Sequence, residues 1–334
     1  SGATFGLVQN DPVLLIVPQF HANAWGLPYA SWMAGADLVM PSRFLQAEAM
    51  CKLIKLTRPT LSAAVPTIWN DVLHHAESHP VDLSSFRMVI CGGSAVPRIL
   101  MERFEERHGL KIVQAWGMTE TSPIATTASL TLARTEGATE EELAEVRSWQ
   151  GLPTFGVELR VVEPDTIDPL PWDGESSGEL QARGSWITGT YYNDDRAGES
   201  FTSDGWLRTG DVAVIMPDGY VRLMDRTKDL IKSGGEWISS VEIENELMAH
   251  PSIREAAVIG VTHPRWSERP LACVVLEAGA TTTKEEILSY LAPKLAKWQL
   301  PDDVVFIDEV PKTSVGKFSK KTLRERFAEY ELPS

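Results

Sequence analysis

Residues 61–95, with the sequence LSAAVPTIWNDVLHHAESHPVDLSSFRMVICGGSA, contain the pattern that decides the fold. The apolar runs Leu61–Val65 and Met88–Cys91 are typical of buried strands, and the amphipathic stretch Thr67–Glu77 between them is typical of a helix. A strand, a helix and a second strand in this order predict a parallel pair joined by a crossover helix. The small residues Gly92–Ala95 follow the second strand, at the edge where parallel sheets collect functional groups.

The same alternation extends over the first 125 residues. The other predicted strands are Leu14–Val17, Asp37–Met40 and Ile112–Val113, and the other predicted helices are Ala47–Thr57 and Pro97–His108. We therefore expect an α/β fold with a mostly parallel sheet covered by helices.

Two further regions follow this one along the chain. After an acidic helix expected at Ala138–Val146, four short runs separated by Gly, Pro and Asp predict an antiparallel β region: Val157–Val162, Gly178–Arg183, Val212–Met216 and Tyr220–Met224. The last region is predicted to hold helices at 241–249, 283–297 and 319–330, and strands at 255–261, 271–276 and 304–307. It is large enough for a small α+β domain, so we expect domains at residues 1–226 and 227–334.

Composition limits the class of function. The 334 residues include 31 Lys and Arg against 46 Asp and Glu, a net charge of −15, which argues against a nucleic-acid binder. Cys51, Cys91 and Cys273 are far apart, so they predict neither a disulfide framework nor a metal site, and they favour the cytoplasm. The sequence contains no long apolar run and no signal-peptide pattern. Because it starts without Met, we expect a piece of a longer protein.

The stretch Gln114–Pro123, QAWGMTETSP, combines the most varied chemistry after a predicted strand. Trp116 could stack on a ring, Thr119 could bind a phosphate, and Glu120 could hold Mg²⁺. The alternative is an ordinary loop with a buried Trp and a Thr that caps a helix.

Other candidate segments also have structural alternatives. The Gly92–Ala95 turn before a helix suits an anion, but it is equally typical of a tight turn. Asp211 follows a Gly and could hold ribose hydroxyls, or it could cap a turn. Residues 225–237 could be a hinge or a plain linker. Lys317 could reach a phosphate or be a surface lysine.

The motifs become specific when they are read in order. The ordered set is Phe20-His21, Gly92–Ala95, Trp116–Glu120, Gly205–Asp211, Asp225–Asp229, Ser233–Glu236 and Pro311–Lys317. From about residue 12 to 327 this set resembles the adenylate-forming superfamily of AMP-forming acyl-CoA synthetases. Phe20–Tyr29 and Ile231–Ser240 resemble the medium- and long-chain fatty-acyl-CoA synthetases most closely.

The resemblance implies a fold, a reaction and partners. It implies the C-terminal part of the large adenylate-forming domain, followed by a small mobile domain. The implied reaction joins a fatty acid or similar carboxylic acid to CoA. The carboxylate first attacks the α-phosphate of Mg·ATP to give an acyl-adenylate and pyrophosphate, and CoA then displaces AMP. The implied cofactors are ATP/AMP, Mg²⁺ and CoA. The resemblance also allows peripheral membrane contact and a homodimer.

The resemblance also implies roles for residues that would meet the nucleotide. The implied adenine site comprises Gly93, Ser94, Ala95, Trp116 and Gly117. Thr119 is expected at the α-phosphate, and Glu120 is expected to bind Mg²⁺. Asp211 is expected to hold the ribose hydroxyls, with Arg226 nearby.

Further implied roles concern the acyl group, CoA and domain motion. His21 is expected near the acyl carboxylate, and Trp25 is expected to gate an apolar acyl tunnel. Lys317 is expected to enter the site for adenylation, and Lys228 is expected to be the hinge. The implied CoA-side residues are Gly234 and Gly235, which leave room for the pantetheine arm, and Lys232 and Trp237, which order the closed state.

One family feature is not found in this sequence. The Ser/Thr/Gly-rich phosphate loop ending in Lys, which normally precedes the Phe-His segment, does not occur upstream of His21. A non-catalytic nucleotide- or acyl-binding fragment is therefore an alternative to a ligase. An aryl or thioether acid is an alternative substrate. A luciferase-like oxygenase is a less favoured alternative function.

Overall fold

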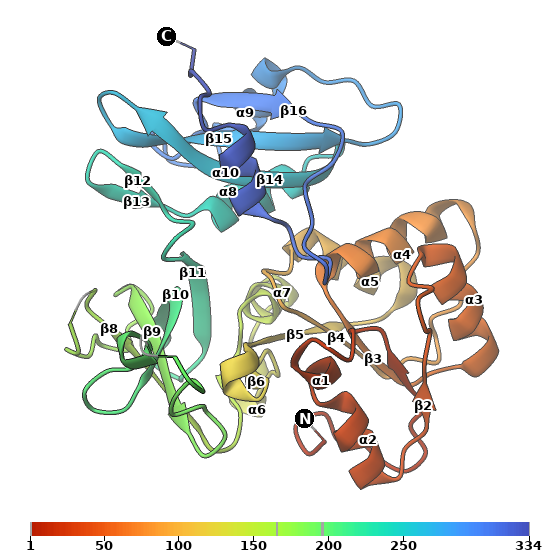
Figure 1. Ribbon diagram of the computed structural model, residues 1–334. Coiled ribbons are helices and arrows are strands. Elements are labelled where there is room, and N and C mark those ends of the chain that lie inside the picture. Colours follow the sequence, from red (N-terminus) through yellow and green to blue (C-terminus); the bar gives the residue numbers. More distant parts are fainter. Residues whose placement is uncertain (1, 165, 195–196, 334) are drawn as a thin grey trace. The chain divides into compact units, whose positions relative to one another are not determined.

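The chain forms two compact units in a computed structural model that describes residues 2–164, 166–194 and 197–333 (Figure 1). The first unit comprises Ser1–Thr209 and Ala213–Leu223, and the second comprises Gly210–Val212 and Met224–Ser334. The expected domain boundary between residues 226 and 227 stays a prediction.

The first unit contains a seven-stranded sheet with the order β2-β1-β3-β4-β5-β6-β7. Its strands are β1 (Val13–Leu15), β2 (Leu38–Val39), β3 (Leu61–Ala64), β4 (Met88–Gly92), β5 (Ile112–Gly117), β6 (Ile124–Thr127) and β7 (Leu152–Pro153). Neighbours from β2 to β5 are parallel, which confirms the parallel core, whereas β6 and β7 pair antiparallel and were not predicted. The order 2-1-3-4-5 is that of a doubly wound sheet, whose ligands bind outside the carboxyl ends of the strands.

Helices pack on both faces of this sheet because successive strand residues point to opposite sides. Leu14 belongs to one apolar cluster, and its neighbours Val13 and Leu15 belong to the other. The first cluster includes residues of α3 (Ala47–Thr57), α4 (Pro66–Ser78) and α5 (Arg98–His108), and the second includes residues of α1 (Ala22–Trp25) and α2 (Leu27–Ala34). The three predicted helices of this region are confirmed, and α1 and α2 were missed.

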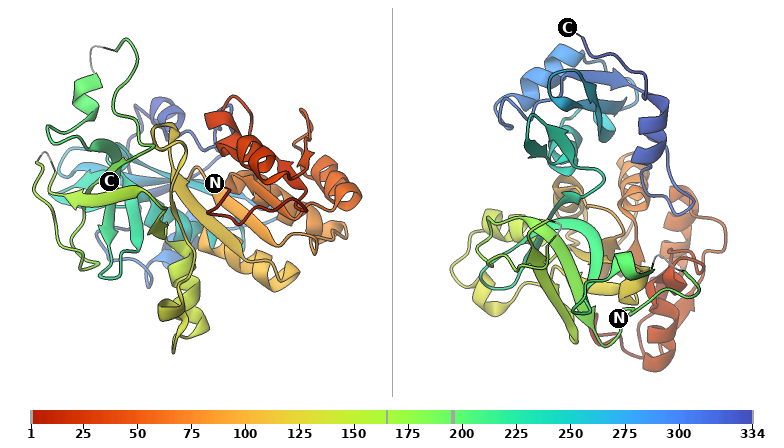
Figure 2. Two further views of the ribbon diagram at one scale, coloured as in Figure 1. Left: turned by 90° about the horizontal axis from the view of Figure 1, so that it is seen from below. Right: turned by 60° about the vertical axis from the view of Figure 1, so that its left-hand side comes forward.

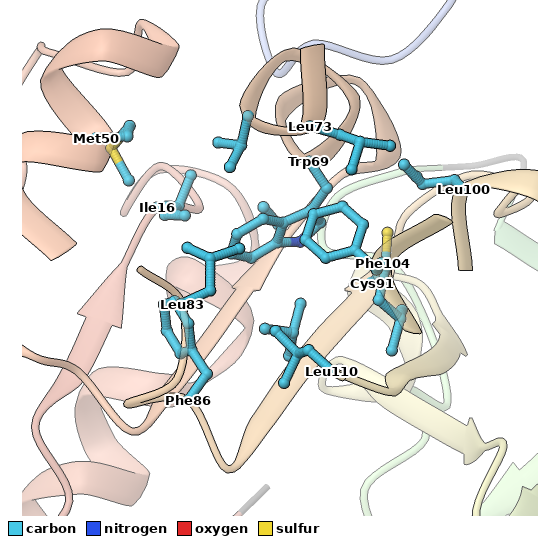
Figure 3. Close-up of a cluster of buried hydrophobic side chains, with 14 of the residues drawn as sticks. Ile16, Met50, Trp69, Leu73, Leu83, Phe86, Cys91, Leu100, Phe104 and Leu110 are labelled. Carbon is cyan, nitrogen blue, oxygen red and sulfur yellow. The ribbon is translucent and has the colours of Figure 1, made fainter. Parts of the chain in front are cut away.

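Trp69 is central to the first cluster (Figure 3). Its side chain is fully buried, and its ring meets Phe86 and Phe104 edge to face, with centroids 6.2 and 6.0 Å away. Edge-to-face contact places the positive edge of one ring on the negative face of another, so these rings add stability beyond simple burial.

A four-stranded sheet with the order β11-β10-β9-β8 forms the β region. Its strands are β8 (Val157–Val162), β9 (Gly178–Gly184), β10 (Leu207–Ile215) and β11 (Val221–Arg226); helices α6 (Leu132–Thr135) and α7 (Glu140–Ser148) and the short helix η2 (Ala197–Ser200) complete the region. The predicted acidic helix is α7, which starts at a capping box between Thr139 and Glu142. Strand β10 begins five residues before the prediction, so Asp211 lies within a strand rather than in a turn.

The second unit contains a five-stranded sheet with the order β13-β12-β15-β14, in which β16 pairs with β15. Its elements are β12 (Ile231–Ser233), β13 (Glu236–Ile238), α8 (Ser240–Met248), β14 (Ile253–His263), β15 (Ser267–Leu276), α9 (Lys284–Leu291), β16 (Asp303–Phe306) and α10 (Lys320–Arg326). Figure 2 shows β14 and β15 as a long twisted hairpin. Helix α9 ends six residues before the prediction because Pro293 lacks the backbone N–H that would continue the helical hydrogen bonds. Helix α10 ends four residues early, and β12 and β13 were missed.

Cys51, Cys91 and Cys273 are buried free thiols, which confirms that they form no disulfide framework. Among the described residues, no helix combines the length and apolar character needed to cross a bilayer.

Candidate functional site

Three segments that follow β1, β4 and β5 carry the candidate residues of the first unit. His21 and Trp25 follow β1, the Gly93–Ala95 turn follows β4, and Thr119 and Glu120 follow β5. The carboxyl ends of parallel strands lie along one edge of a sheet, and ligands of such sheets bind there. The candidates therefore lie at the edge of the sheet where the sequence placed them, and their roles stay predictions.

The segment after β1 has a strained backbone. All four residues of α1, from Ala22 to Trp25, have positive φ values between 44° and 55°, so this turn is left-handed. The left-handed conformation costs roughly 1–2 kcal/mol for each residue with a Cβ. His21 precedes the turn, and its N–H donates to the Pro18 carbonyl at 3.0 Å. The turn buries Trp25, which is 8% exposed, in the second apolar cluster.

Two different constraints explain the glycines at the end of β4. A Cβ at Gly92 would lie 2.3 Å from the Ala115 carbonyl oxygen and 3.8 Å from the Trp25 ring. Gly93 has φ 82°, a conformation that strains any other residue. The next two residues, Ser94 and Ala95, are exposed and so are accessible to a ligand.

The buried side chain of Gln114 holds the end of the Gly93–Ala95 turn, and this role was not predicted. Its side-chain carbonyl accepts from the Val96 N–H at 3.0 Å, and its amide donates to the carbonyls of Ser148 and Trp149 at 2.7 and 2.8 Å. A buried amide with three partners is expensive to replace. An isolated Gln gives no signal of this role in the sequence.

No side chain fits at Gly117, the last residue of β5. A Cβ there would lie 1.8 Å from the Pro123 carbonyl oxygen. Trp116 is 9% exposed and packs into a third apolar cluster with β8 and β9, as in the alternative that the sequence analysis left open. Its contact with adenine stays a prediction. The short helix η1 (Thr119–Thr121) follows, with Thr119 exposed and Glu120 half-buried.

Glu120 is held at two points by a later segment. The Tyr191 hydroxyl donates to Glu120 Oε1 at 2.8 Å, and the Thr188 N–H donates to the Glu120 carbonyl at 2.8 Å. Carboxylate and hydroxyl oxygens suit Mg²⁺, which nucleotide enzymes hold with one or two carboxylates plus substrate phosphates. Among the described residues, no three His, Cys, Asp or Glu side chains gather to form a metal cage. Glu120 therefore fits a Mg²⁺ ion that arrives on a nucleotide.

In the second unit, the structure brings together Asp211, Arg226 and Lys317. Asp211 is 6% exposed, and its Oδ1 lies 3.4 Å from Arg226 Nε. Burial and the charge of Arg226 lower the pKa of Lys317, and the charge of Asp211 opposes them. The Lys317 main chain closes a tight loop through bonds with Thr313 at 2.7 and 3.2 Å. This arrangement offers two cations and one carboxylate to a phosphorylated sugar.

A buried ionic network holds the segment that contains the expected hinge. Both the N–H and the hydroxyl of Ser240 donate to Asp225 Oδ2, at 2.7 and 2.5 Å. Lys320 donates to the Ser240 hydroxyl at 2.6 Å and pairs with Glu244 at 2.8 Å. Burial raises the pKa of Glu244 to about 6, although Lys320 opposes this shift. One ammonium group therefore faces two buried carboxylates.

Helix α10, which carries Lys320, also holds the other end of this segment, at Asp229. Arg324 lies one turn after Lys320 on α10, which is the dark-blue helix in the right-hand view of Figure 2. It donates to Asp229 at 2.8 Å. Exposed Lys228 therefore lies between two anchored acids, Asp225 and Asp229. Both acids belong to a predicted candidate segment, but their partners were not predicted: Ser240 follows Asp225 by 15 residues, and Arg324 follows Asp229 by 95.

The β12–β13 hairpin carries the remaining candidates. Gly234 and Gly235 form its turn with φ values of 62° and 95°. The Lys232 ammonium lies 5.3 Å from the exposed Trp237 ring. A Cβ at Gly234 would lie 2.8 Å from the Trp266 ring, a neighbour that the sequence did not reveal.

Comparison with known proteins gives a consistent result. The family model described as AMP-binding enzyme matches residues 1–192, and that of the AMP-binding enzyme C-terminal domain matches residues 242–317. A 3-methylmercaptopropionyl-CoA ligase of Ruegeria lacuscaerulensis is 46% identical over 95% of this chain and 58% of its own length. A long-chain-fatty-acid–CoA ligase of Thermus thermophilus is also 46% identical, over 97% of this chain and 60% of its own length.

Solved structures agree with these sequence matches. An anthranilate CoA ligase in complex with anthranoyl-AMP superposes with a TM-score of 0.85 at 26% identity, over 97% of this chain and 61% of its own. The chain thus spans about 60% of the length of these relatives. The resemblance to the adenylate-forming superfamily and the α/β fold are confirmed, and the chain belongs to the AMP-binding enzyme family.

Proposed function

We propose that this chain belongs to an AMP-forming ligase that joins a fatty acid to CoA through an acyl-adenylate. The observation that carries the proposal is the position of two segments at the ends of adjacent parallel strands. The Gly93–Ala95 turn follows β4, and the loop that holds Glu120 follows β5. This edge suits a nucleotide, with exposed main chain on one segment and an anchored carboxylate on the other.

Residues of this chain would act mainly by positioning and charge in the first half-reaction. Thr119 would bind the α-phosphate, and Asp211 would accept hydrogen bonds from the ribose hydroxyls. His21 would lie near the acyl carboxylate. A bound Mg²⁺ ion at Glu120 would neutralise phosphate charge. Electrostatic stabilisation of this kind contributes strongly in phosphate chemistry because little covalent work falls to side chains.

Lys317 would bring the acyl carboxylate and the α-phosphate together. The expected test is Lys317→Ala in the full-length protein, with Lys321→Ala as the control because Lys321 is 84% exposed. We expect loss of ATP–pyrophosphate exchange by at least about 100-fold, the size of effect typical of one lost charge-stabilising group. Thioester formation from supplied acyl-AMP should change little. Equal loss of both half-reactions would contradict the role of Lys317.

The second half-reaction would use the second unit. Rotation at Lys228 would present the β12–β13 hairpin, where Gly234 and Gly235 leave room for the pantetheine arm of CoA. Lys232 and Trp237 would order this closed state, and their cation–π contact supports a preformed arrangement. Cysteine substitution and spin labelling at one exposed position in each unit would measure the rotation on addition of CoA.

Two relatives of equal similarity support different carboxylic acids as the substrate. Trp25 would gate an apolar acyl tunnel, and the Thermus relative supports a fatty acid. The Ruegeria relative, equally similar, supports 3-methylmercaptopropionate as a second candidate. A panel of short, medium and long fatty acids, 3-methylmercaptopropionate and benzoates would separate them by kcat/KM for CoA thioester formation. We expect the highest value for a fatty acid.

A non-catalytic binding protein is the alternative from another class. It would bind AMP but would show no ATP–pyrophosphate exchange with any acid of the panel. A cytoplasmic location, a homodimer and peripheral membrane contact remain predictions, which fractionation, light scattering and vesicle sedimentation would test.

A further inference from the structure

We propose that Tyr191 is a positioning residue that orients the Glu120 carboxylate toward nucleotide-bound Mg²⁺. The proposal rests on the metal role of Glu120 proposed above. It adds a residue that follows Glu120 by 71 positions and that no motif of the sequence analysis contained.

The contact joins both parts of Glu120 to one short segment. The Tyr191 hydroxyl bonds the side chain at Oε1, and the Thr188 N–H bonds the main-chain carbonyl, each at 2.8 Å. One bond alone would fix either the backbone or the side chain. Two bonds from residues 188 and 191 fix the backbone and the carboxylate orientation together.

The segment is itself ordered, so it can act as a support. The Thr188 hydroxyl donates to the Thr190 carbonyl at 2.8 Å. The Tyr191 ring lies 6.0 Å from the Phe201 ring, tilted by 53°. Phe201 in turn bridges to Leu207 at the start of β10. The hydroxyl of Tyr191 therefore points at Glu120 from a ring that packing holds in place.

The chemistry of the contact suits a carboxylate that must bind a metal. A phenol is a neutral donor, so Glu120 keeps the negative charge that attracts Mg²⁺, whereas an Arg or Lys partner would offset it. The hydroxyl occupies Oε1 and leaves Oε2 for the metal. Second partners of this kind orient metal ligands, and their loss typically weakens metal binding by 10- to 100-fold.

Tyr191→Phe removes the hydroxyl and keeps the ring that packs against Phe201. Its control is Tyr192→Phe, because the adjacent Tyr192 is 99% exposed. Calorimetric titration of the full-length protein with ATP at a series of Mg²⁺ concentrations gives the Mg²⁺ needed for half-maximal binding. Titration with AMP without metal reports whether the nucleotide site is intact.

We expect Tyr191→Phe to raise the Mg²⁺ requirement about 10-fold, at the lower end of the range for a lost metal-ligand support. AMP affinity should change less than about twofold, and Tyr192→Phe should match the parent protein. In a Glu120→Gln background the effect of Tyr191→Phe should disappear, because Tyr191 acts through that carboxylate.

Four results would overturn the proposal. An unchanged Mg²⁺ requirement in Tyr191→Phe, with a raised requirement in Glu120→Gln, would reject Tyr191 alone. A lowered requirement would mean that the hydroxyl competes with the metal. An unchanged requirement in Glu120→Gln would reject the metal role of Glu120 and, with it, the positioning role of Tyr191. Parallel loss of AMP and Mg·ATP binding in Tyr191→Phe would assign the residue a structural role instead.

Discussion

Two short segments that carry candidate residues are stabilised in opposite ways. The loop Gly117–Pro123 has its backbone fixed by neutral hydrogen bonds between near neighbours, centred on the buried hydroxyl of Thr121, while Thr188 and Tyr191 hold Glu120. The segment Asp225–Asp229 is held by Ser240 of α8, which bonds Asp225 beside the buried Lys320–Glu244 ion pair, and by the charged Arg324 of α10, which bonds Asp229 from 95 residues later.

This difference predicts how each segment responds to pH and to loss of its partner residues. Neutral local bonds do not titrate, so the backbone around Thr121 should keep its shape over a wide pH range. Buried charges depend on their partners and on protonation, so the second segment should respond to both.

The largest effect is expected from Lys320→Met. It removes the one cation that faces the carboxylates of Asp225 and Glu244 in this network, leaving buried negative charge uncompensated. Breaking a buried pair costs about 3–5 kcal/mol, and we expect the free energy of unfolding of the second unit to fall by this amount in urea titration. Lys321→Met is the control, since Lys321 is exposed. Equal losses in the two variants would show that Lys320 contributes no more to the free energy of unfolding than an exposed lysine does.

A smaller effect is expected from Thr121→Val in the neutral loop. The change leaves the Met118 N–H, now bonded at 2.9 Å, without its partner, which costs about 1–3 kcal/mol. The loss should be the same at pH 5 and pH 7.5. Thr126→Val is the matched control, because the buried Thr126 hydroxyl has no hydrogen-bond partner among the described residues. A loss of stability in Thr121→Val that changes with pH would contradict the difference between the two segments.

The smallest effect concerns the pH dependence of the ionic segment. The pKa of Glu244 is about 6 in the folded chain against an ordinary value of 4.5, so protonation favours the folded state. The resulting stability is fully present below pH 4.5 and is lost as the pH rises through 6. Relative to Glu244→Gln, the parent protein should therefore gain about 1 kcal/mol between pH 7.5 and pH 5 in urea titrations.

Glu246→Gln on the same helix is the control for Glu244→Gln. Glu246 pairs with Lys294 near the surface, where solvent screens the interaction. This variant should follow the pH profile of the parent protein. If Glu244→Gln does the same, the buried network does not make the second segment sensitive to pH.

The sequence predicted the elements whose signals are local. Helix α3 was predicted at its observed bounds because its apolar residues repeat with helical spacing and it lies between loop residues. The turn at Gly92–Ala95 was recognised because paired glycines before a helix are typical of a tight turn, and Gly93 has φ 82°. Such features depend on a few consecutive residues.

Features that depend on distant partners were not predictable in this way. The left-handed turn at Ala22–Trp25 has no glycine until its end, so its residues give no warning of the conformation. The contacts of Glu120 with Tyr191, of Asp225 with Ser240 and of Ser240 with Lys320 join positions 15 to 80 residues apart in pairs that share no spacing rule. Their discovery required the folded chain.

The three buried cysteines make this protein convenient for labelling. Burial raises the pKa of Cys51 to about 11 and of Cys273 to about 12, and it raises the pKa of Cys91 further. At pH 8 fewer than about one in a thousand of these thiols would be the reactive thiolate. A cysteine introduced at exposed Lys228 would therefore react with a maleimide dye as a single site. The native thiols would remain a silent background for fluorescence measurements of domain motion.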